Sequence, residues 1–579
     1  MKFNYKIIVA GVLSASSLTS CYDLDLYPHD EVSTGVFWKT EEHAKQAMMG
    51  VYDCMKAKAD APGVAKFGDI YLMDALTDMA GANPLVALQN GTSNNRTATY
   101  KNKWSNMYDG IAKANHMLQN LPNIEMSEEK LQEFQAEARF MRAFFYFHLL
   151  DFYGGVPIYD ESWILSEVYD QMKEPRSTAE QVAEFIRKDL DFAEERLPYS
   201  WDAANYGRAT KAAAVALRGK MHLYMKQYDT AKKDFEKLVN NKSQYGCDLH
   251  PDYAEMFKPD TDENKEMIFF ISNSGGVGDT NDGLSMAFYH GSRSTFGSGW
   301  STSTLLPDFV DAYEMKDGKK FNWDDYIPGY TKMTPAQRRQ AMGCKQKNGK
   351  VTEYPELLAK IEEAYENRDP RLKQTIIAPY DSILGWLNNK EHWMQHVIFA
   401  DATGPTATNG YVQQGTSRWY HLRKFVPEGD WGGQIMSREN TPVNFPLIRY
   451  ADVLLMLAEC HNELGNIDEA IKYINMVRAR PSTNMPGLNS GPQWLEARTK
   501  EEVFKRIVHE RGVEFAVEGL RYSDLRRWRL AETYCTFQKT DMHGVKRHDV
   551  KFTERDYLWP IPGTEIEMND KLIQNPGWE

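Results

Sequence analysis

The sequence predicts a mostly α-helical protein, in which helix–turn–helix pairs with tetratricopeptide-like spacing form a scaffold that carries one loop-rich insertion. Three observations predict this class: a shared pattern in 209–240 and 447–478, helical periodicity across 40–150, and a change of composition in 246–444. The chain has 579 residues, of which 42% are hydrophobic and 26% charged. This is the balance of a globular protein that is long enough to bury a large core.

The two similar segments each have a small residue, a second small residue twelve positions later and a large apolar residue four positions after that. These are Gly219, Ala231 and Phe235 in the first segment, and Ala458, Ala470 and Ile474 in the second. Small residues let two antiparallel helices approach closely while the large residue fills the groove between them, which is the tetratricopeptide packing pattern. The segments are therefore predicted to be units of a helical solenoid.

Helical periodicity is also clear before these units. Trp104, Tyr108, Ile111 and Leu118 recur on one face, as in an amphipathic helix. From 128 to 150 the pattern predicts a deeply buried helix with two adjacent apolar stripes. The helix should end at Gly154, because Gly leaves a helix without steric cost.

The insertion, 246–444, is rich in Gly, Ser, Asn and Thr at 272–303 and has scattered Trp and Tyr further on. Long irregular loops in a compact protein usually carry function, so the ligand-binding surface is expected here and in the polar loop 78–103. A flat aromatic ring matches the apolar C–H face of a sugar, while polar side chains bind its hydroxyls. The candidate ligand-binding residues are Asp78, Asn83, Tyr289, Trp300, Trp323 and Trp431.

The N-terminus has the pattern of a secretory signal peptide. Lys2 and Lys6 precede a short apolar run, and a Leu-Thr-Ser-Cys sequence ending at Cys21 has the form of a bacterial lipobox, which predicts lipidation of this cysteine. The predicted regions are a signal peptide at 1–20, an N-terminal helical scaffold at 21–245, the insertion at 246–444, and a C-terminal helical scaffold with a closing segment at 445–579. The remaining five cysteines form no CxxC pair and are expected to be buried.

Charge and motifs exclude several function classes. The formal net charge is −13, which argues against nucleic-acid binding, since that requires a basic face. Glu510, Glu514 and Glu518 share one helix face with interleaved arginines, which predicts a structural ion-pair network because neighbouring arginines lower carboxylate pKa values and so remove the general acid. No catalytic or cofactor motif is present, and no cofactor is expected.

Structural calcium is left open at two loops. The fragments are Asp260, Asp262 and Asn264 in one loop, and Asp279, Asn281, Asp282 and Gly283 in the other. The first has Lys265 where a calcium-binding EF-hand loop has glycine. A solvated turn is the simpler reading of both.

Several further stretches occur in order along the chain. They are Trp104-x-x-x-Tyr108-x-x-Ile111-x-x-Ala114-Asn115, Ala136-Glu137-Ala138-Arg139-Phe140 through Tyr153-Gly154-Gly155-Val156-Pro157, Asn367-Arg368-Asp369-Pro370-Arg371-Leu372, Leu447-Ile448-Arg449-Tyr450-Ala451-Asp452, Glu510-Arg511 through Glu518-Gly519-x-Arg521, Tyr557-Leu558-Trp559-Pro560, and Asn575-Pro576-Gly577-Trp578. With the lipobox at Cys21, they make nearly the whole chain resemble the SusD-like (RagB/SusD) outer-membrane lipoproteins.

The resemblance implies a lipid-anchored protein on the outer face of the outer membrane that captures an oligosaccharide or polysaccharide without cleaving it. It also implies a SusC-like, TonB-dependent transporter as partner, over which the protein sits as a lid. Arg449, Asp452, Glu510 and Arg521 then form ion pairs inside the scaffold. Two alternatives remain open: the same role with a peptide ligand, and a surface glycoside hydrolase, which requires two facing carboxylates with one raised pKa.

Overall fold

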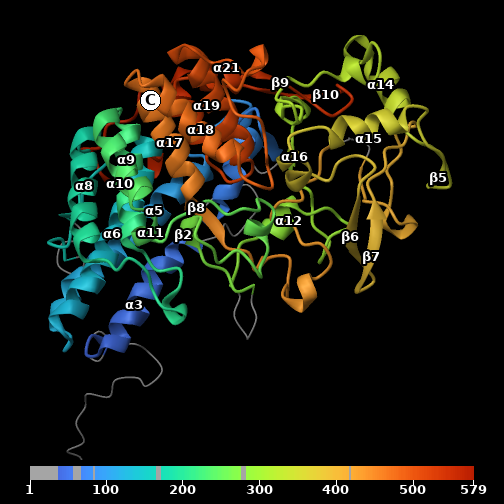
Figure 1. Ribbon diagram of the computed structural model, residues 1–579. Coiled ribbons are helices and arrows are strands. Elements are labelled where there is room, and N and C mark those ends of the chain that lie inside the picture. The colour runs from blue at the N-terminus through green and yellow to red at the C-terminus, as the bar shows by residue number, and fades with distance from the viewer. Residues whose placement is uncertain (1–36, 57–66, 83–84, 165–170, 276–281, 416–418) are drawn as a thin grey trace, which may run out of the picture.

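The computed structural model describes residues 37–56, 67–82, 85–164, 171–275, 282–415 and 419–579. The scaffold helices form one side of the molecule, and the elements of 246–444 form the opposite side (Figure 1). On that side lie α14 (Pro335–Met342), α15 (Leu358–Glu366) and the hairpin of β6 (Ser382–Leu387) and β7 (Lys390–Gln395). The signal peptide, Cys21 and Asn83 lie outside the described residues.

The N-terminal helices pack in sequence order around a shared core. They are α3 (Glu41–Asp53), α5 (Ala98–Asn120), α6 (Glu128–Tyr153) and α8 (Ala179–Arg196). The stripe predicted on α5 is buried at Trp104, Ile111 and Leu118. Helix α6 ends where predicted, because Gly154 takes a φ of 75°, which only glycine adopts freely.

The helix pairs predicted from the small-residue spacing are present. They are α9 (Lys211–Tyr224) with α10 (Tyr228–Asn240), and α17 (Tyr450–Glu463) with α18 (Ile467–Arg478). A Cβ atom added to Gly219 would lie 2.6 Å from the ring of Phe235, so glycine is required for the close approach of α9 and α10. Helix α10 also packs against α17, so segments far apart in sequence form one helical array, as Figure 1 shows.

A pair of strands brings the two ends of the insertion together. Strand β2 (Met267–Ile271) pairs antiparallel with β8 (Phe445–Arg449), with every residue of both strands buried. The insertion also contributes β3 (Ser303–Leu305), which pairs with β1 (Ala80–Ala82) of the polar loop 78–103. Hydrogen bonding therefore joins the two regions in which a ligand site was expected.

The insertion contains more regular structure than its composition predicts. Its helices are α12 (Met286–His290), α13 (Pro307–Ala312), α14 (Pro335–Met342), α15 (Leu358–Glu366) and α16 (Arg371–Thr375), and its hairpins are β4 (Lys345–Lys347) with β5 (Lys350–Glu353) and β6 (Ser382–Leu387) with β7 (Lys390–Gln395). Elsewhere lie α4 (Val86–Gln89), α11 (Lys242–Tyr245), α19 (Lys500–Glu514), α20 (Arg521–Arg527), α21 (Ala531–Tyr534), α22 (Gly563–Met568), β9 (Phe537–Thr540) and β10 (Lys546–Val550).

The cysteine prediction is confirmed for the five cysteines that follow Cys21. Cys54, Cys247, Cys344, Cys460 and Cys535 are all buried and carry free thiols. Burial raises the pKa of the Cys54 and Cys247 thiols to about 12, so these thiols stay protonated and unreactive at neutral pH. Within the described part of the chain, every helix is too short or too polar to span a bilayer.

Candidate functional site

An exposed tryptophan lies at the centre of the glycine- and serine-rich part of the insertion. Trp300 is 47% exposed, and its ring centroid lies 4.8 Å from that of Phe288 on α12. The guanidinium carbon of Arg293, itself exposed, lies 5.5 Å from the centroid of the Trp300 ring. Trp300 therefore offers an aromatic face to solvent, with a cationic hydrogen-bond donor beside it.

The loop that carries Trp300 is held in an unusual conformation by backbone hydrogen bonds. The amide of Trp300 donates to the carbonyl of Phe288 (2.8 Å), and that of Ser301 donates to the carbonyl of Gly291 (2.7 Å). Ser298 and Ser301 have φ values of 60° and 48°, which are uncommon for residues other than glycine. Strain of this kind concentrates at ligand sites, where the surrounding structure fixes side chains in advance.

A second aromatic pair adjoins this loop. The ring centroid of Phe296 lies 5.0 Å from that of Trp386 on β6, and the Trp386 amide donates to the carbonyl of Ser294 (2.8 Å). In the β6–β7 register Trp386 faces Glu391, and the alternation of side chains places Trp393, which is 70% exposed, on the same face of the hairpin. We call Phe288, Phe296, Trp300, Trp386 and Trp393 the aromatic surface.

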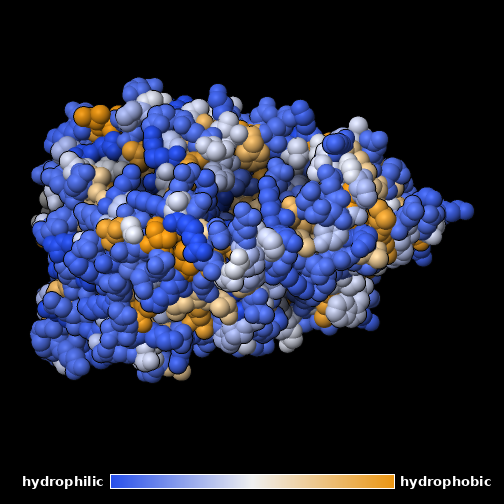
Figure 2. All heavy atoms as spheres, turned by 45° about the horizontal axis from the view of Figure 1, so that its top comes forward, coloured by the Kyte–Doolittle hydropathy of each residue, from blue (hydrophilic) through white to orange (hydrophobic). Residues whose placement is uncertain are grey.

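The aromatic surface has the chemistry of a carbohydrate platform. Its rings can cover apolar C–H faces, and Arg293 can donate to hydroxyl or carboxylate oxygens. The face of the protein seen in Figure 2 is mostly hydrophilic, with separate hydrophobic patches. Among the described residues few large hydrophobic side chains are exposed, and Trp300 and Trp393 are two of them. Exposed aromatic side chains are therefore exceptions on this protein and candidates for binding.

Two of the aromatic residues predicted as ligand contacts are instead part of the core. Tyr289 is 8% exposed and packs against Tyr71 and Phe288, and Trp323 is 6% exposed. The Nε1–H of Trp323 donates to Asp311 at 3.1 Å. Neither ring presents a face to solvent, so the structure gives no support to a ligand contact at either residue.

Two other candidates take different positions. Both carboxylate oxygens of Asp78 accept hydrogen bonds from Arg521 at 2.8 Å, so Asp78 forms a structural ion pair at the edge of the scaffold. Trp431 is half-buried and lines a cavity of about 550 Å³. A groove of about 630 Å³ between α5 and α22 contains none of the candidate ligand-binding residues.

Sequence reasoning did not select Phe288, Phe296, Trp386 or Trp393. Phe288 and Phe296 lie in the same Gly/Ser-rich segment as Trp300, so composition alone could have included them. The hairpin had a signal too: Asn388 and Asn389 stand between its strands, and both have positive φ, as a type I′ turn requires.

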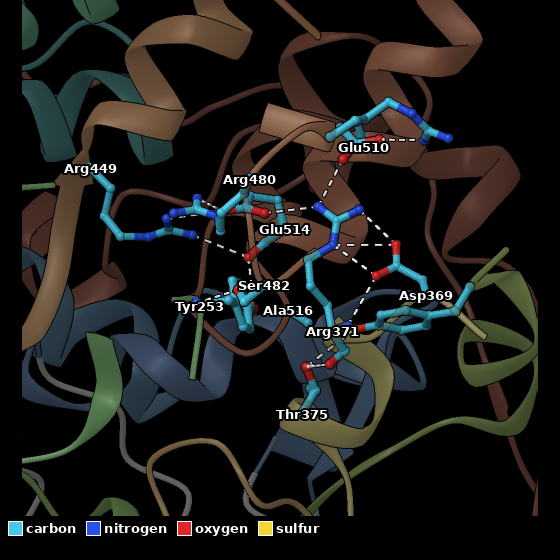
Figure 3. Close-up of polar contacts among 12 residues, drawn as sticks. Tyr253, Asp369, Arg371, Thr375, Arg449, Arg480, Ser482, Glu510, Glu514 and Ala516 are labelled. Atoms are coloured by element: carbon cyan, nitrogen blue, oxygen red, sulfur yellow. Dashed lines mark hydrogen bonds and ion pairs between the residues drawn. The ribbon is translucent and has the colours of Figure 1, made fainter. Parts of the chain in front are cut away.

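The predicted carboxylate network is fully paired and cannot act as an acid–base pair. Glu514 accepts from Arg371 (2.8 Å), Arg449 (3.1 Å) and Arg480 (2.7 Å) (Figure 3). Glu510 accepts from Arg478 (2.9 Å) and forms an ion pair with Arg371 (2.7 Å). Burial alone would raise the pKa of Glu514, but these arginines outweigh it and hold the pKa well below its usual range. A carboxylate in this state cannot serve as a general acid.

The other residues expected to pair inside the scaffold do so. Arg449 pairs with Glu266, Glu514 and Glu518, and Asp452 pairs with Lys220 and Arg511. The helix-face arginines are not the partners of these glutamates. Arg506 pairs with Glu314, Arg511 with Asp452, and Arg521 with Asp78.

The carboxylates of the two calcium fragments have protein partners where they are described. Asp262 accepts from the amide of Asn444 (2.6 Å), Asp260 accepts from Gln434 (2.8 Å), and Asp282 pairs with Lys56. Asp279 and Asn281 lie outside the described residues. Among the residues that the structure does describe, no three His, Cys, Asp or Glu side chains are placed to hold a metal ion.

Asp262 makes stability depend on pH. Burial, with a smaller contribution from Glu263, raises its pKa from 3.8 to about 7, so the folded state favours the protonated form. The stability that this proton contributes is complete below pH 3.8 and is lost as pH rises through about 7. Asp262→Asn removes the ionisable group. We expect the change in Tm that it causes to be more favourable at alkaline pH than at acidic pH by about 2 °C or more, measured by scanning calorimetry. Asp570→Asn, an exposed control, should shift Tm equally at both pH values, and a shift that is equal at both pH values for Asp262→Asn would contradict the prediction.

Comparison with known proteins decides the family. The family model described as "SusD family" matches residues 265–578, and the model described as "Starch-binding associating with outer membrane" matches 24–223. The chain belongs to the SusD family. Together these matches span the helical scaffold and the insertion.

Relatives within the SusD family align over most of their length. SusD-like protein P2 of Formosa agariphila is 26% identical over 99% of both chains, and the starch-binding protein SusD of Bacteroides thetaiotaomicron is 24% identical over 78% of this chain and 74% of its own.

Solved structures show the same fold. A SusD-like carbohydrate-binding protein of Bacteroides fragilis superposes with a TM-score of 0.72 at 24% identity, covering 93% of this chain and 100% of its own. The surface glycan-binding protein A of B. thetaiotaomicron, solved with laminarihexaose, has a TM-score of 0.62 at 20% identity, covering 93% of this chain and 100% of its own.

Proposed function

We propose that this protein captures an oligosaccharide or polysaccharide at the cell surface, does not cleave it, and delivers it to a SusC-like, TonB-dependent transporter in the outer membrane. Its relatives include proteins named for binding starch and laminarin. Lipidation at Cys21 would anchor it to the outer face of the membrane. The paired state of Glu510 and Glu514 supports binding without hydrolysis.

The observation that carries the binding proposal is the exposed ring of Trp300 beside Arg293 and Phe288. Preformed aromatic faces bind sugars without first having to order flexible side chains, because the strained loop already holds them in place. An open surface of this kind gives affinities from about micromolar to about millimolar, or about −8 to −4 kcal/mol.

The test is native affinity electrophoresis of the chain starting after Cys21, through gels that contain plant, microbial or host polysaccharides. We expect retardation by at least one polysaccharide, with no release of reducing ends. Trp300→Ala should weaken that binding about fivefold or more, because removal of a central aromatic anchor typically costs more than about 1 kcal/mol.

Trp494→Ala provides a matched control. Trp494 is 42% exposed, but its Nε1–H donates to Asp317 and its ring lies against Lys319, outside the aromatic surface. Trp494→Ala should leave polysaccharide binding unchanged. Equal binding by both variants would reject the aromatic surface as the site. Release of reducing ends from the polysaccharide would favour a surface glycoside hydrolase. Co-purified peptides without glycan binding would favour a peptide ligand.

A further inference from the structure

The cavity beside Trp431 has an unusual concentration of positive charge for an acidic protein. It has a volume of about 550 Å³ and is lined by six cationic and three anionic side chains, although the whole chain has 68 Lys and Arg against 81 Asp and Glu. The cations are Lys258, Lys316, Arg368, Lys373, Arg423 and Lys424. Such a cavity concentrates positive potential and attracts anions.

The anionic side chains of the lining do not neutralise all of these cations. Glu366 pairs with Lys373 (2.7 Å), and Glu428 pairs with Arg423 (3.1 Å). Asp369, the third anion, pairs with Arg371, which lies outside the cavity lining. The negative charge of Asp369 is therefore compensated by Arg371 and not by a cation of the cavity.

Two cations of the cavity have no carboxylate partner within the described parts of the chain. Lys258 pairs with Glu255 and Lys424 with Glu518, whereas Lys316 and Arg368 form no ion pair with a described residue. The backbone holds these two cations close together: Met315 and Arg368 form an antiparallel bridge, and the amide of Lys316 donates to the carbonyl of Asn367 at 2.8 Å.

The hydrogen bonds and the ring contact of Arg368 are all to neutral groups. Its side chain is 1% exposed, its Nε and Nη2 donate to the carbonyls of Tyr313 (2.9 Å) and Val310 (2.6 Å), and its guanidinium carbon lies 3.6 Å from the centroid of the Phe321 ring. The Nη1 atom has no acceptor among the described residues. The buried carboxyl of Asp311 acts on the Arg368 charge, but burial raises the pKa of Asp311 to about 7, so Asp311 compensates that charge only in part. An anion in the adjoining cavity would lower the remaining cost of burying the charge.

An aromatic wall completes the cavity. Trp431 has a φ of 49°, which is strained for a bulky side chain, and Phe425 on the same lining has a φ of 62°. The loop between them is tied to the hairpin of the aromatic surface, since the amide of Gly429 donates to the carbonyl of Leu384 (2.6 Å). The structure therefore holds Trp431 at the cavity despite this strain.

Strand β6 connects the cavity with the aromatic surface. At one end Arg423 of the cavity donates to the carbonyl of Ser382 (3.3 Å), and further along Trp386 packs on Phe296. Four residues of strand separate these points, about 13 Å. The cavity and the aromatic surface are therefore joined by one strand.

We infer that this cavity binds the acidic group of a charged glycan, a uronic-acid carboxylate or a sulfate ester, through Lys316 and the field of Arg368, with Trp431 covering the sugar ring. The inference rests on the proposed function and narrows it to anionic polysaccharides. Carboxylate and sulfate present the same chemistry to a lysine and an arginine, a negative charge with several acceptor oxygens.

The test compares acidic glycans with their neutral counterparts in the same electrophoresis. The probes are polygalacturonate and alginate with their carboxyl-reduced forms, and dextran sulfate and carrageenan with dextran and desulfated carrageenan. We expect retardation by at least one acidic probe and little by its neutral counterpart. The retardation should fall in about 1 M salt, where the Debye length is about 3 Å. The uronate and sulfate arms identify which acidic group is bound.

Lys316→Glu should weaken binding of that acidic probe about tenfold, equivalent to about 1.4 kcal/mol, because it reverses an unpaired charge. Lys319→Glu is the control: Lys319 is exposed, pairs with Asp317 (3.2 Å) and is absent from the cavity lining. Equal unfolding temperatures would show that both variants fold.

Retention of neutral glycans only, or equal weakening by both charge reversals, would overturn the anionic site and leave glycan capture standing. Failure to bind any polysaccharide would overturn both proposals. Binding of an acidic peptide without any glycan would do the same, and would assign the cavity to a different ligand.

Discussion

Glu514→Ala is expected to lower the free energy of unfolding by about 3–5 kcal/mol or more, because it leaves buried charges without a partner. Glu514 is fully buried, and its two carboxylate oxygens accept from Arg371, Arg449 and Arg480 (Figure 3). Arg371 lies in the insertion, whereas Arg449 and Arg480 lie in two segments of the C-terminal scaffold. The network therefore joins the insertion to that scaffold. Chemical denaturation followed by circular dichroism measures the change.

The same helix supplies a control for this prediction. Glu501 of α19 has a side chain that is 78% exposed and pairs only with Lys505, one turn away. Glu501→Ala should change stability by less than about 0.5 kcal/mol, as is usual for exposed i,i+4 pairs. If the two variants were equally stable, the network would not hold the insertion and the scaffold together.

How far the sequence determines these features depends on how local the signal is. The helix pairs α9–α10 and α17–α18 are predictable because the spacing of small and large residues lies within about 30 residues of chain. The glutamate network is only half predictable. Periodicity places Glu510 and Glu514 on one face of α19, but their partners lie elsewhere in the sequence. Helix α19 also ends at Glu514, so Glu518 reaches the network from the turn that follows.

The aromatic candidates show the limit of composition as evidence. Trp300 and Trp323 both lie in the insertion among polar residues, yet one is 47% exposed and the other 6%. Trp323 is buried because its indole N–H donates a hydrogen bond to Asp311 and its ring packs on Phe321 and Tyr330. Such contacts depend on tertiary structure. In elements of only a few residues, the hydrophobic periodicity of the sequence does not indicate which side chains are buried.

Gly219→Val tests the feature that the sequence predicted best, the close packing of α9 and α10. A Cβ atom at this position would lie 2.6 Å from Cε1 of Phe235, and that ring is completely buried between the helices. We expect a loss of about 3 kcal/mol, because an overfilled core must displace side chains or backbone. Thermal unfolding measures it, and Phe235→Leu in the same chain should recover part of the loss by removing the obstructing ring.

Gly50 separates steric overfilling from the general effect of placing valine in a helix. It lies inside α3, where a Cβ atom would have no other atom within 4 Å. Valine and glycine differ by only a few tenths of a kcal/mol in helix propensity, so Gly50→Val should change stability by less than about 0.5 kcal/mol. If Gly219→Val were equally mild, α9 and α10 could move apart freely, and the spacing of small residues would not set the distance between them. A large loss at Gly219 alone would show that a single missing side chain fixes how closely the two helices pack.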